Sequence, residues 1–188
     1  MMTAKRCSWC ERDALYRAYH DEEWGRPIHD DQRLFELLVL ESFQAGLSWY
    51  TILAKREGFR AAFDGFDYRL IAAYDDAKVE ALMQDTRIVR NRRKILATIQ
   101  NAALFMEIQK EFGSFSAFIW AFVGGSPCVN HPRKLEDVPA STPTSDAIAA
   151  ELKRRGFKFF GTTVAYAFMQ AVGLVNDHVE DCAFKYPD

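Results

Sequence analysis

The chain has 188 residues, of which 49% are hydrophobic, and this fraction supports a core in one domain (1–188) or in two small lobes that share it. The formal charge of −2 argues against indiscriminate binding to polyanions but permits a local basic face. Residues 1–9 are short and polar, unlike a secretory signal, and the apolar run 37–54 contains Glu41, Gln44, Gly46 and two serines, which excludes a membrane span. We therefore expect a soluble, intracellular protein.

The spacing of apolar residues, caps and glycines predicts an all-α protein of about eight to ten helices. Residues 1–10 form an extended arm, 21–27 a turn, and 124–143 the one long loop, which contains four prolines. No alternating strand pattern of useful length occurs. The predicted helices cover 13–20, a segment from Asp30 or Asp31 through Glu41, 48–63, 67–73, 75–84, 91–112, 115–123, 145–155, 162–175, and a short last helix from Asp177 to about Cys182.

Glu41 is the only charged residue between positions 37 and 54. It lies at helical spacing on an apolar stripe. A carboxylate on such a face loses solvation and needs a cation, hydrogen-bond donors or a raised pKa. This favours a functional role for Glu41, although a hydrogen-bonded structural glutamate remains an alternative. The stripe consists of Leu34, Leu37, Leu38, Glu41 and Ala45.

Aromatic residues gather around this carboxylate. Gly46 is expected to end its helix, and Ser48 can cap a new helix that begins at Trp49, which places an indole beside Glu41. A flat aromatic pocket around one carboxylate suits a planar, electron-poor ligand, although most aromatic residues belong to cores and Trp24 is expected there. The cluster comprises Trp9, Tyr16, Tyr19, Trp24 and Trp49.

The four cysteines, Cys7, Cys10, Cys128 and Cys182, make a poor disulfide framework in a chain of this size and compartment. Metal ligation is the better interpretation for some of them. His178 and Cys182 are four residues apart on a predicted helix, and Cys7 with His20 would complete a closed, structural zinc site that joins the two ends of the chain. The Cys7–Cys10 spacing is a rival pairing, because it is typical of a zinc knuckle.

Residues 145–175 have the form of a helix-hairpin-helix, with the sequence GFKFFG between two helices. The hairpin amides flanked by Gly156 and Gly161, followed by a helix from Thr162, suit a phosphate without reading base sequence. Positive charge around the hairpin comes from Lys153, Arg154, Arg155 and Lys158, and the stretch 87–94 adds five basic residues. A basic run is usually a solvated face, so together these two patches shift the interpretation only moderately toward DNA.

Five separated blocks together resemble the DNA-3-methyladenine glycosylase I family: CSW at 7–9, YHDEEWG at 19–25, LESFQAGLSW at 40–49, KRRGFKFFGTT at 153–163 and GLVNDHVEDC at 173–182. The resemblance implies a helix-hairpin-helix glycosylase fold with a structural zinc, bound by Cys7, His20, His178 and Cys182 rather than by Cys10. It also implies that Glu41 recognises the base, with Tyr16, Trp49 and Trp9 as the pocket aromatics. Tyr19, the helical neighbour of Tyr16, is predicted to contact the base as well.

The implied reaction is hydrolysis of the N-glycosidic bond of 3-methyladenine in alkylated double-stranded DNA, which releases the free base and leaves an abasic site. The resemblance further implies a bacterial cytosolic enzyme that acts on nucleoid DNA, and we expect a monomer. No lysine lies in the pocket blocks, so a lyase step is not expected. The usual catalytic aspartate of helix-hairpin-helix relatives is expected to be missing, with Asp177 as a helix cap. Gly156, Lys158, Gly161 and Thr162 are the expected contacts to the DNA backbone.

Two positions depart from the family pattern or are unusual in it. Ser42 stands where the family most often has glycine, and its hydroxyl could hydrogen-bond locally. Cys10 could compete for the metal. A zinc-stabilised DNA-binding module without chemistry and a zinc hydrolase are the alternatives, and a closed Cys2His2 shell argues against the hydrolase.

Overall fold

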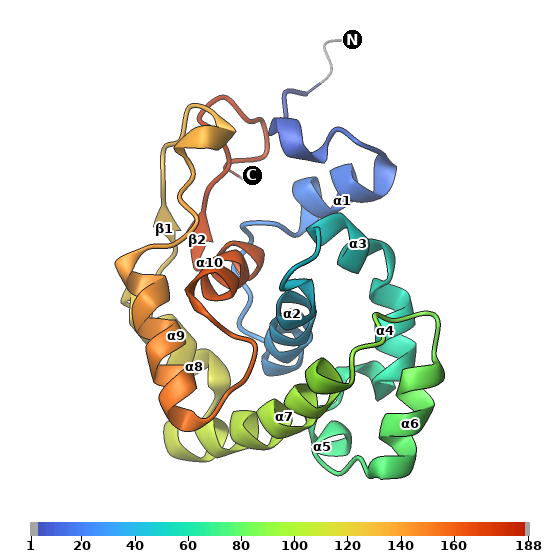
Figure 1. Cartoon of the computed structure of the whole chain (residues 1–188). Coiled ribbons are helices and arrows are strands. Elements are labelled where there is room, and N and C mark those ends of the chain that lie inside the picture. The colour runs from blue at the N-terminus through green and yellow to red at the C-terminus, as the bar shows by residue number, and fades with distance from the viewer. Residues whose placement is uncertain (1–3, 187–188) are drawn as a thin grey trace.

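The structure, a computed structural model, describes residues 4–186 (Figure 1). The predicted mostly helical architecture is confirmed. The α-helices are α1 (Ala14–Glu22), α2 (Asp31–Gln44), α3 (Trp49–Ala54), α4 (Arg56–Ala62), α5 (Tyr68–Ile71), α6 (Asp76–Gln84), α7 (Arg92–Phe112), α8 (Phe115–Trp120), α9 (Pro143–Arg155) and α10 (Thr162–Ala171). Short 3-10 helices cover η1 (Ser8–Cys10), η2 (Asp64–Phe66), η3 (Ala121–Val123) and η4 (Leu135–Asp137), and β1 (Cys128–Val129) pairs in parallel with β2 (Val175–Asn176).

Polar side chains fix where most of these helices begin. The predicted cap Asp30 accepts a hydrogen bond from the backbone of Arg33 at the start of α2, and Asp67 and Asp75 cap α5 and α6 in the same way. Asn91 caps α7. These bonds satisfy amides that a helix leaves without internal partners, so the element boundaries follow the sequence closely.

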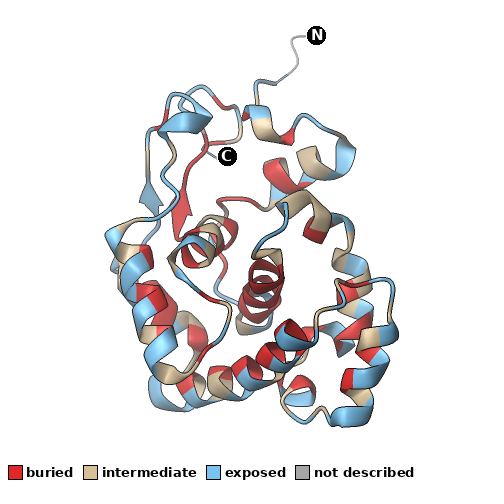
Figure 2. Ribbon diagram, in the orientation of Figure 1, coloured by how far each residue is buried: buried red, intermediate tan, exposed pale blue. Residues whose placement is uncertain are grey.

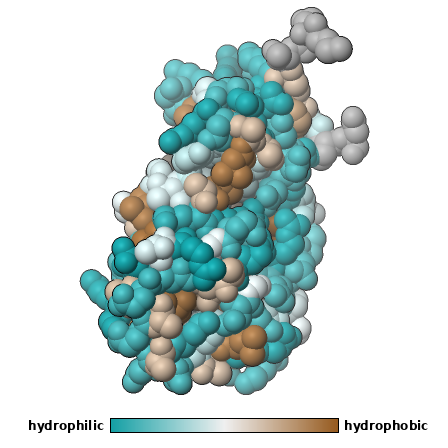
Figure 3. All heavy atoms as spheres, turned by 90° about the vertical axis from the view of Figure 1, so that its right-hand side faces the viewer, coloured by the Kyte–Doolittle hydropathy of each residue, from teal (hydrophilic) through white to brown (hydrophobic). Residues whose placement is uncertain are grey.

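Helix α2 forms the centre of the molecule. All ten residues from Leu34 to Phe43 are buried, and the helix packs against α3, α7, α8 and α10 (Figure 2). A smaller cluster near the N-terminus contains Trp24, which is buried as predicted. The side of the molecule in Figure 3 is mostly hydrophilic, with small and separate apolar patches. Among the described helices, none has the length and hydropathy needed to cross a bilayer.

Three predicted helices differ in the structure. The helix predicted over 48–63 is two helices, because the backbone leaves helical geometry at Lys55 (φ −100°, ψ 2°). The helix predicted over 162–175 ends at Ala171. Gly173 (φ +74°) then brings the backbone so close to Arg26 that a Cβ would lie 2.3 Å from the Arg26 carbonyl carbon, which leaves no room for a helical turn.

The last predicted helix, from Asp177 to about Cys182, does not form. This segment follows β2 as a series of turns. The parallel pairing of β2 with β1 holds it extended as far as Asn176. Two-residue strands of this kind leave no alternating pattern in a sequence, which explains why both were missed.

Candidate active site

A cavity of about 380 Å³ lies between the N-terminal segment, α1, α2, α3, α10 and the loop that connects η3 to α9. Its volume falls in the usual range for small-molecule sites. The five residues predicted to recognise a base all line it: Trp9, Tyr16, Tyr19, Glu41 and Trp49. All five lie within the first 49 residues, on η1, α1, α2 and the start of α3, whereas α10 and the loop contribute further lining residues.

Glu41 is 2% exposed, and its Oε2 atom is buried without a hydrogen-bond partner among the described residues. Burial raises the pKa of this carboxyl well above its usual value. Ser42 turns its hydroxyl away and donates to the carbonyl oxygen of Leu38 at 2.8 Å, so the predicted local bond of Ser42 is confirmed and leaves Glu41 untouched. The carboxyl therefore gains most from a ligand that brings positive charge or hydrogen-bond donors.

Aromatic rings form the other walls. The Trp9 ring centroid lies 4.9 Å from that of Tyr16 and 5.0 Å from that of Trp24, and the Tyr19 and Trp49 centroids are 5.3 Å apart. Burial and then the nearby Glu41 raise the pKa of the Tyr19 phenol. The indole Nε1 of Trp49 is buried without an acceptor in the described part of the chain. The cavity thus presents flat apolar faces with two unsatisfied polar atoms.

Lys94 of α7 fixes the position of Trp49 relative to Glu41. Its buried ammonium donates to the carbonyl oxygens of Phe43 (2.8 Å), in the last turn of α2, and of Ala45 (2.6 Å), the C-cap residue of that helix. These contacts hold the chain where it turns through Gly46 (φ +81°) into α3. Burial lowers the pKa of Lys94. In the sequence Lys94 is one of the five basic residues of the stretch 87–94, and nothing there predicts this role.

Asp177 is not a helix cap, and the prediction that assigned it one is wrong. The side chain is 2% exposed and lines the cavity. Its carboxylate accepts hydrogen bonds from the Tyr166 hydroxyl (2.6 Å), the Gln170 amide (2.9 Å) and the Asn130 amide (2.7 Å). It therefore joins the loop after η3 to α10, because donors from these two elements satisfy it.

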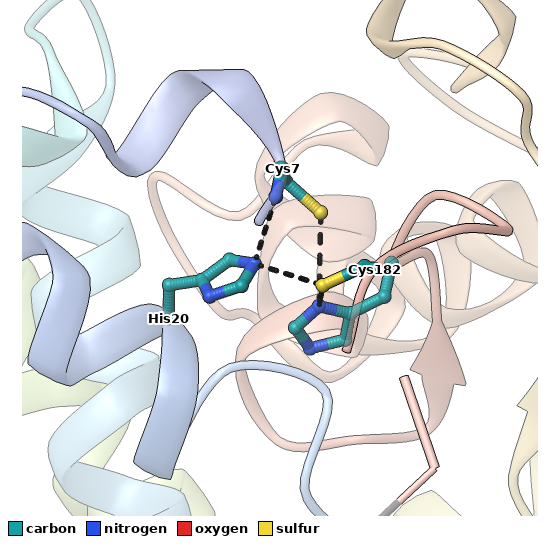
Figure 4. A group of neighbouring side chains, drawn as sticks. Cys7, His20 and Cys182 are labelled. Atoms are coloured by element: carbon teal, nitrogen blue, oxygen red, sulfur yellow. Dashed lines mark hydrogen bonds between the residues drawn. The ribbon is translucent and has the colours of Figure 1, made fainter. Parts of the chain in front are cut away.

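A group of four buried side chains joins the two ends of the chain: Cys7, His20, His178 and Cys182 (Figure 4). Their ligand atoms lie within 4.8 Å of one another. Cys182 Sγ is 3.4 Å from His178 Nδ1 and 3.6 Å from His20 Nε2, and Cys7 Sγ is 3.7 Å from His178 Nδ1. Neighbouring ligands of a tetrahedral zinc ion are separated by about 3.5 Å, given bonds of about 2.0–2.3 Å.

Outer contacts orient both histidines of this group. The Nδ1 atom of His20 lies 2.7 Å from a carboxylate oxygen of Asp21, and Nε2 of His178 lies 3.0 Å from the carbonyl oxygen of Trp24. Such partners fix the tautomer that leaves the other nitrogen free to ligate. Cys10 is outside the group, and its thiol contacts the carbonyl oxygen of Cys7 instead. His178 and Cys182 lie on irregular backbone that follows β2, and not on a helix as predicted.

The segment between α9 and α10 is a tight hairpin fastened to α7. The Gln100 amide donates to the carbonyl oxygen of Gly156 (2.6 Å), and Asn101 exchanges two hydrogen bonds of 3.0 Å with the backbone of Lys158. Gly161, the N-cap residue of α10, supplies no side-chain cap, so the first amides of this helix remain available. The Thr162 hydroxyl is already engaged, since it donates to Asp146 at 2.6 Å.

Comparison with known proteins identifies the family. The family model for methyladenine glycosylases matches residues 9–186. This chain belongs to the methyladenine glycosylase family. It is 50% identical over 178 residues to DNA-3-methyladenine glycosylase 1 of Escherichia coli, with 95% of each chain covered, and 46% identical over 180 residues to DNA-3-methyladenine glycosylase of Haemophilus influenzae, covering 96% of this chain and 97% of the relative.

Solved structures of the family have the same fold. A crystal structure of 3-methyladenine DNA glycosylase I matches with a TM-score of 0.92 and 51% identity, covering 95% of this chain and 98% of the other. A structure described as the basis of 3-methyladenine recognition by the Staphylococcus aureus glycosylase matches with a TM-score of 0.94 and 36% identity, covering 97% of both chains.

Several residues that line the cavity were not predicted from the sequence to do so. Leu135, Val138 and Pro139 of the long loop line the cavity, as do Gln44 and Asp177. The loop shows no periodicity, so nothing in its sequence places it beside residues more than 80 positions away. Arg154 and Arg155, predicted to supply charge to the hairpin, are instead paired with Glu151 at 2.6 Å and 2.7 Å.

Proposed function

We propose that this protein hydrolyses the N-glycosidic bond of 3-methyladenine in double-stranded DNA, releasing the free base and leaving an abasic site. The observation that carries the proposal is the buried, unpartnered carboxyl of Glu41 in the wall of an aromatic cavity. Relatives with 50% and 46% identity are named as enzymes of this specificity. The damaged nucleotide must leave the duplex to enter the cavity, and a damaged pair costs less to open.

Charge discriminates the damaged base from normal adenine. Methylation at N3 makes the base cationic in DNA, so it stabilises the carboxylate form of Glu41 that burial otherwise disfavours. At about 4 Å and an effective dielectric constant of about 20, this pair is worth roughly 4 kcal/mol before desolvation is subtracted. Neutral adenine brings no charge to offset the burial of the carboxylate. Trp9, Tyr16, Tyr19 and Trp49 hold the flat base by stacking and cation–π contact.

The cleavage needs little further help because the leaving group is already activated. The electron pair of the bond between C1′ and N9 moves to the base, which departs neutral, and a water molecule adds to C1′ and loses a proton. No lysine belongs to the lining of the cavity among the described residues, so the enzyme forms no imine with the sugar and is monofunctional.

A structural zinc ion bound by Cys7, His20, His178 and Cys182 is part of the proposal. Four protein ligands leave no position for water, so the ion supplies folding energy and no chemistry. Because Cys7 also lines the cavity, two residues before Trp9, a bound ion would hold the wall that carries Trp9. Chelation should lower the melting temperature and release one equivalent of zinc per chain, and a Cys182→Ser variant should purify without that equivalent.

The hairpin is proposed to bind the DNA backbone without reading sequence. The uncapped amides at Gly161 and the start of α10, with the exposed ammonium of Lys158, suit a phosphate. Gly156 (φ +101°) allows the sharp turn that ends α9. Thr162 contributes its backbone amide, because its hydroxyl is bonded to Asp146. These contacts would present any duplex to the cavity, where the base is selected.

The deciding experiment measures free bases released from N-methylated duplex DNA by the wild type and by Glu41→Gln. We expect the wild type to release 3-methyladenine and the variant to be slower by roughly 100-fold or more, since about 2.7 kcal/mol of lost charge stabilisation gives that factor. Binding of both proteins to a duplex with an abasic-site analogue controls for folding. Equal release would reject the role of Glu41, whereas DNA binding without release by the wild type would indicate a non-catalytic DNA-binding module.

A further inference from the structure

The basic stretch at 87–94 divides into separate groups once its side chains are placed. Arg87 pairs with Asp85 at 2.7 Å, Arg92 pairs with Glu80, and Lys94 is buried on the end of α2. Arg93 differs from all three. It is exposed, and no carboxylate within residues 4–186 lies at ion-pair distance from it. Arg90 is likewise exposed and has no such carboxylate among the described residues, so two charges in the run are available to a ligand, and Arg93 is the one that lines the groove described next.

Arg93 faces the hairpin across a groove of about 480 Å³. The groove contains no acidic residue and has two exposed cations, Arg93 and Lys158. The guanidinium carbon of Arg93 lies 5.8 Å from the ring centroid of Phe159, which keeps this long side chain beside the hairpin. The complete lining is Arg93, Leu96, Ala97, Gln100, Lys158 and Phe159.

The groove is also rigid. Gln100 and Asn101 fasten the hairpin backbone to α7 by three hydrogen bonds of 2.6–3.0 Å. Phe159 adopts a left-handed conformation (φ +55°) that a non-glycine residue seldom takes, and such strain persists only where surrounding contacts impose it. The backbone at Lys158 is therefore held in place beside α7, which carries Arg93, before any ligand arrives, and this lowers the entropic cost of binding.

We propose that this groove between α7 and the hairpin is a second phosphate-binding site for the DNA backbone, with Arg93 and Lys158 as its cations. The inference rests on the proposed binding of the hairpin to DNA and extends it by a further contact along the same strand. Two cations on a rigid backbone, without an acidic residue in the lining, fit a phosphodiester, and the apolar side chains of Leu96 and Phe159 fit the deoxyribose between phosphates. Although the net charge of the chain is −2, positive charge is concentrated at this groove, where the duplex would bind.

Salt dependence of DNA binding tests the site. The probe is a duplex with an abasic-site analogue, titrated at several salt concentrations with the wild type, Arg93→Gln and Arg92→Gln. Loss of one phosphate contact should make the slope of log K against log salt shallower by about 0.9, which corresponds to about eight-fold weaker binding at 0.1 M salt. Arg92→Gln is the matched control, because it removes the same formal charge one residue away from a side chain already paired with Glu80.

Neutral methylphosphonates placed one at a time along each strand then locate the contact. We expect one position that weakens binding by the wild type and by Arg92→Gln but not by Arg93→Gln. Slopes that are equal for Arg93→Gln and Arg92→Gln would overturn the second site while leaving the glycosylase intact. Folded wild type that does not bind the duplex at all would instead overturn the proposed function itself.

Discussion

Helix α2 carries two carboxylates at similar depth and with opposite surroundings. Glu36 is 4% exposed and Glu41 is 2% exposed. Glu36 accepts hydrogen bonds from Arg56 at 2.7 Å and Arg60 at 2.8 Å, whereas Glu41 has an oxygen with no partner in the described chain. Depth alone therefore does not mark a functional acid. A buried acid without a partner is the better sign of function, because a ligand must then offset the cost of burying its carboxyl group.

Asp177 is an intermediate case. It is as buried as Glu41 and lines the same cavity, but three uncharged donors satisfy it. The three acids thus form a series: Glu36 held by two cations, Asp177 by neutral donors, and Glu41 by neither. If the partners of a buried acid determine whether it serves stability or function, removing the charge should reduce stability most at Glu36 and not at all at Glu41.

The largest effect on stability is expected for Glu36→Gln. The change leaves the mostly buried Arg56 with only Glu23, and loss of one partner in a buried ion pair costs about 3 kcal/mol. This corresponds to a drop in melting temperature of roughly 6–12 °C. Chemical denaturation measures the loss directly. Glu57→Gln is the control, since Glu57 is 82% exposed in its pair with Arg60 and should change stability by less than about 0.5 kcal/mol.

A smaller loss is expected for Asp177→Asn. An amide cannot accept from three donors, so at least one of Tyr166, Gln170 and Asn130 loses its acceptor, at a cost of about 2 kcal/mol. Hydrogen exchange should show the loop after η3 opening first, because Asn130 links it to α10. Asp181→Asn, which alters an exposed acid paired with Lys5, is the control. Unchanged stability together with lost excision would instead place Asp177 in the reaction.

The sequence was sufficient to predict a functional role for Glu41. It was not sufficient to predict how the partners of Glu36, Asp177 and Glu41 differ. The isolation of Glu41 between positions 37 and 54 is a local property, as are the caps of α2, α5 and α6. The partners of Glu36 and Asp177, by contrast, come from elements that are distant in the sequence. Arg56 and Arg60 reach Glu36 only because the chain breaks at Lys55 into two helices, and Asn130 reaches Asp177 only through the pairing of β1 with β2.

The same limit applies to the basic residues. A run of positive charge predicts a face for polyanions, but four of the predicted cations are paired with acids: Arg87, Arg92, Arg154 and Arg155. Lys94 is buried against backbone carbonyls. Which charges remain available depends on acids brought in from other helices, and helical spacing within one element does not report them. The predicted aromatic residues do line one cavity and the four Cys and His residues do lie together, because the resemblance covers them as complete motifs.

The last expected effect, which separates Glu41 from the other two acids, is a gain in stability when its charge is removed. Burial raises the pKa of Glu41 above the ordinary value of 4.5, so the folded protein resists ionising it. Its contribution to stability is complete below about pH 4.5 and is lost as the pH rises toward the folded pKa, at about 1.4 kcal/mol per pH unit. Glutamine has no charge to bury, so Glu41→Gln should match the wild type near pH 4.5 and exceed it increasingly at higher pH.

Melting temperatures of both proteins from pH 4.5 to pH 8 measure this difference, and the other titrating groups cancel in the comparison. Each kcal/mol corresponds to roughly 2–4 °C, so the gap should widen by a few degrees per pH unit until the folded pKa is passed. A constant gap would mean that Glu41 finds a donor in solution, and the contrast with Glu36 would then fail. A widening gap, together with lost excision, would show that the enzyme keeps an unfavourable buried acid because its cationic substrate supplies the missing partner.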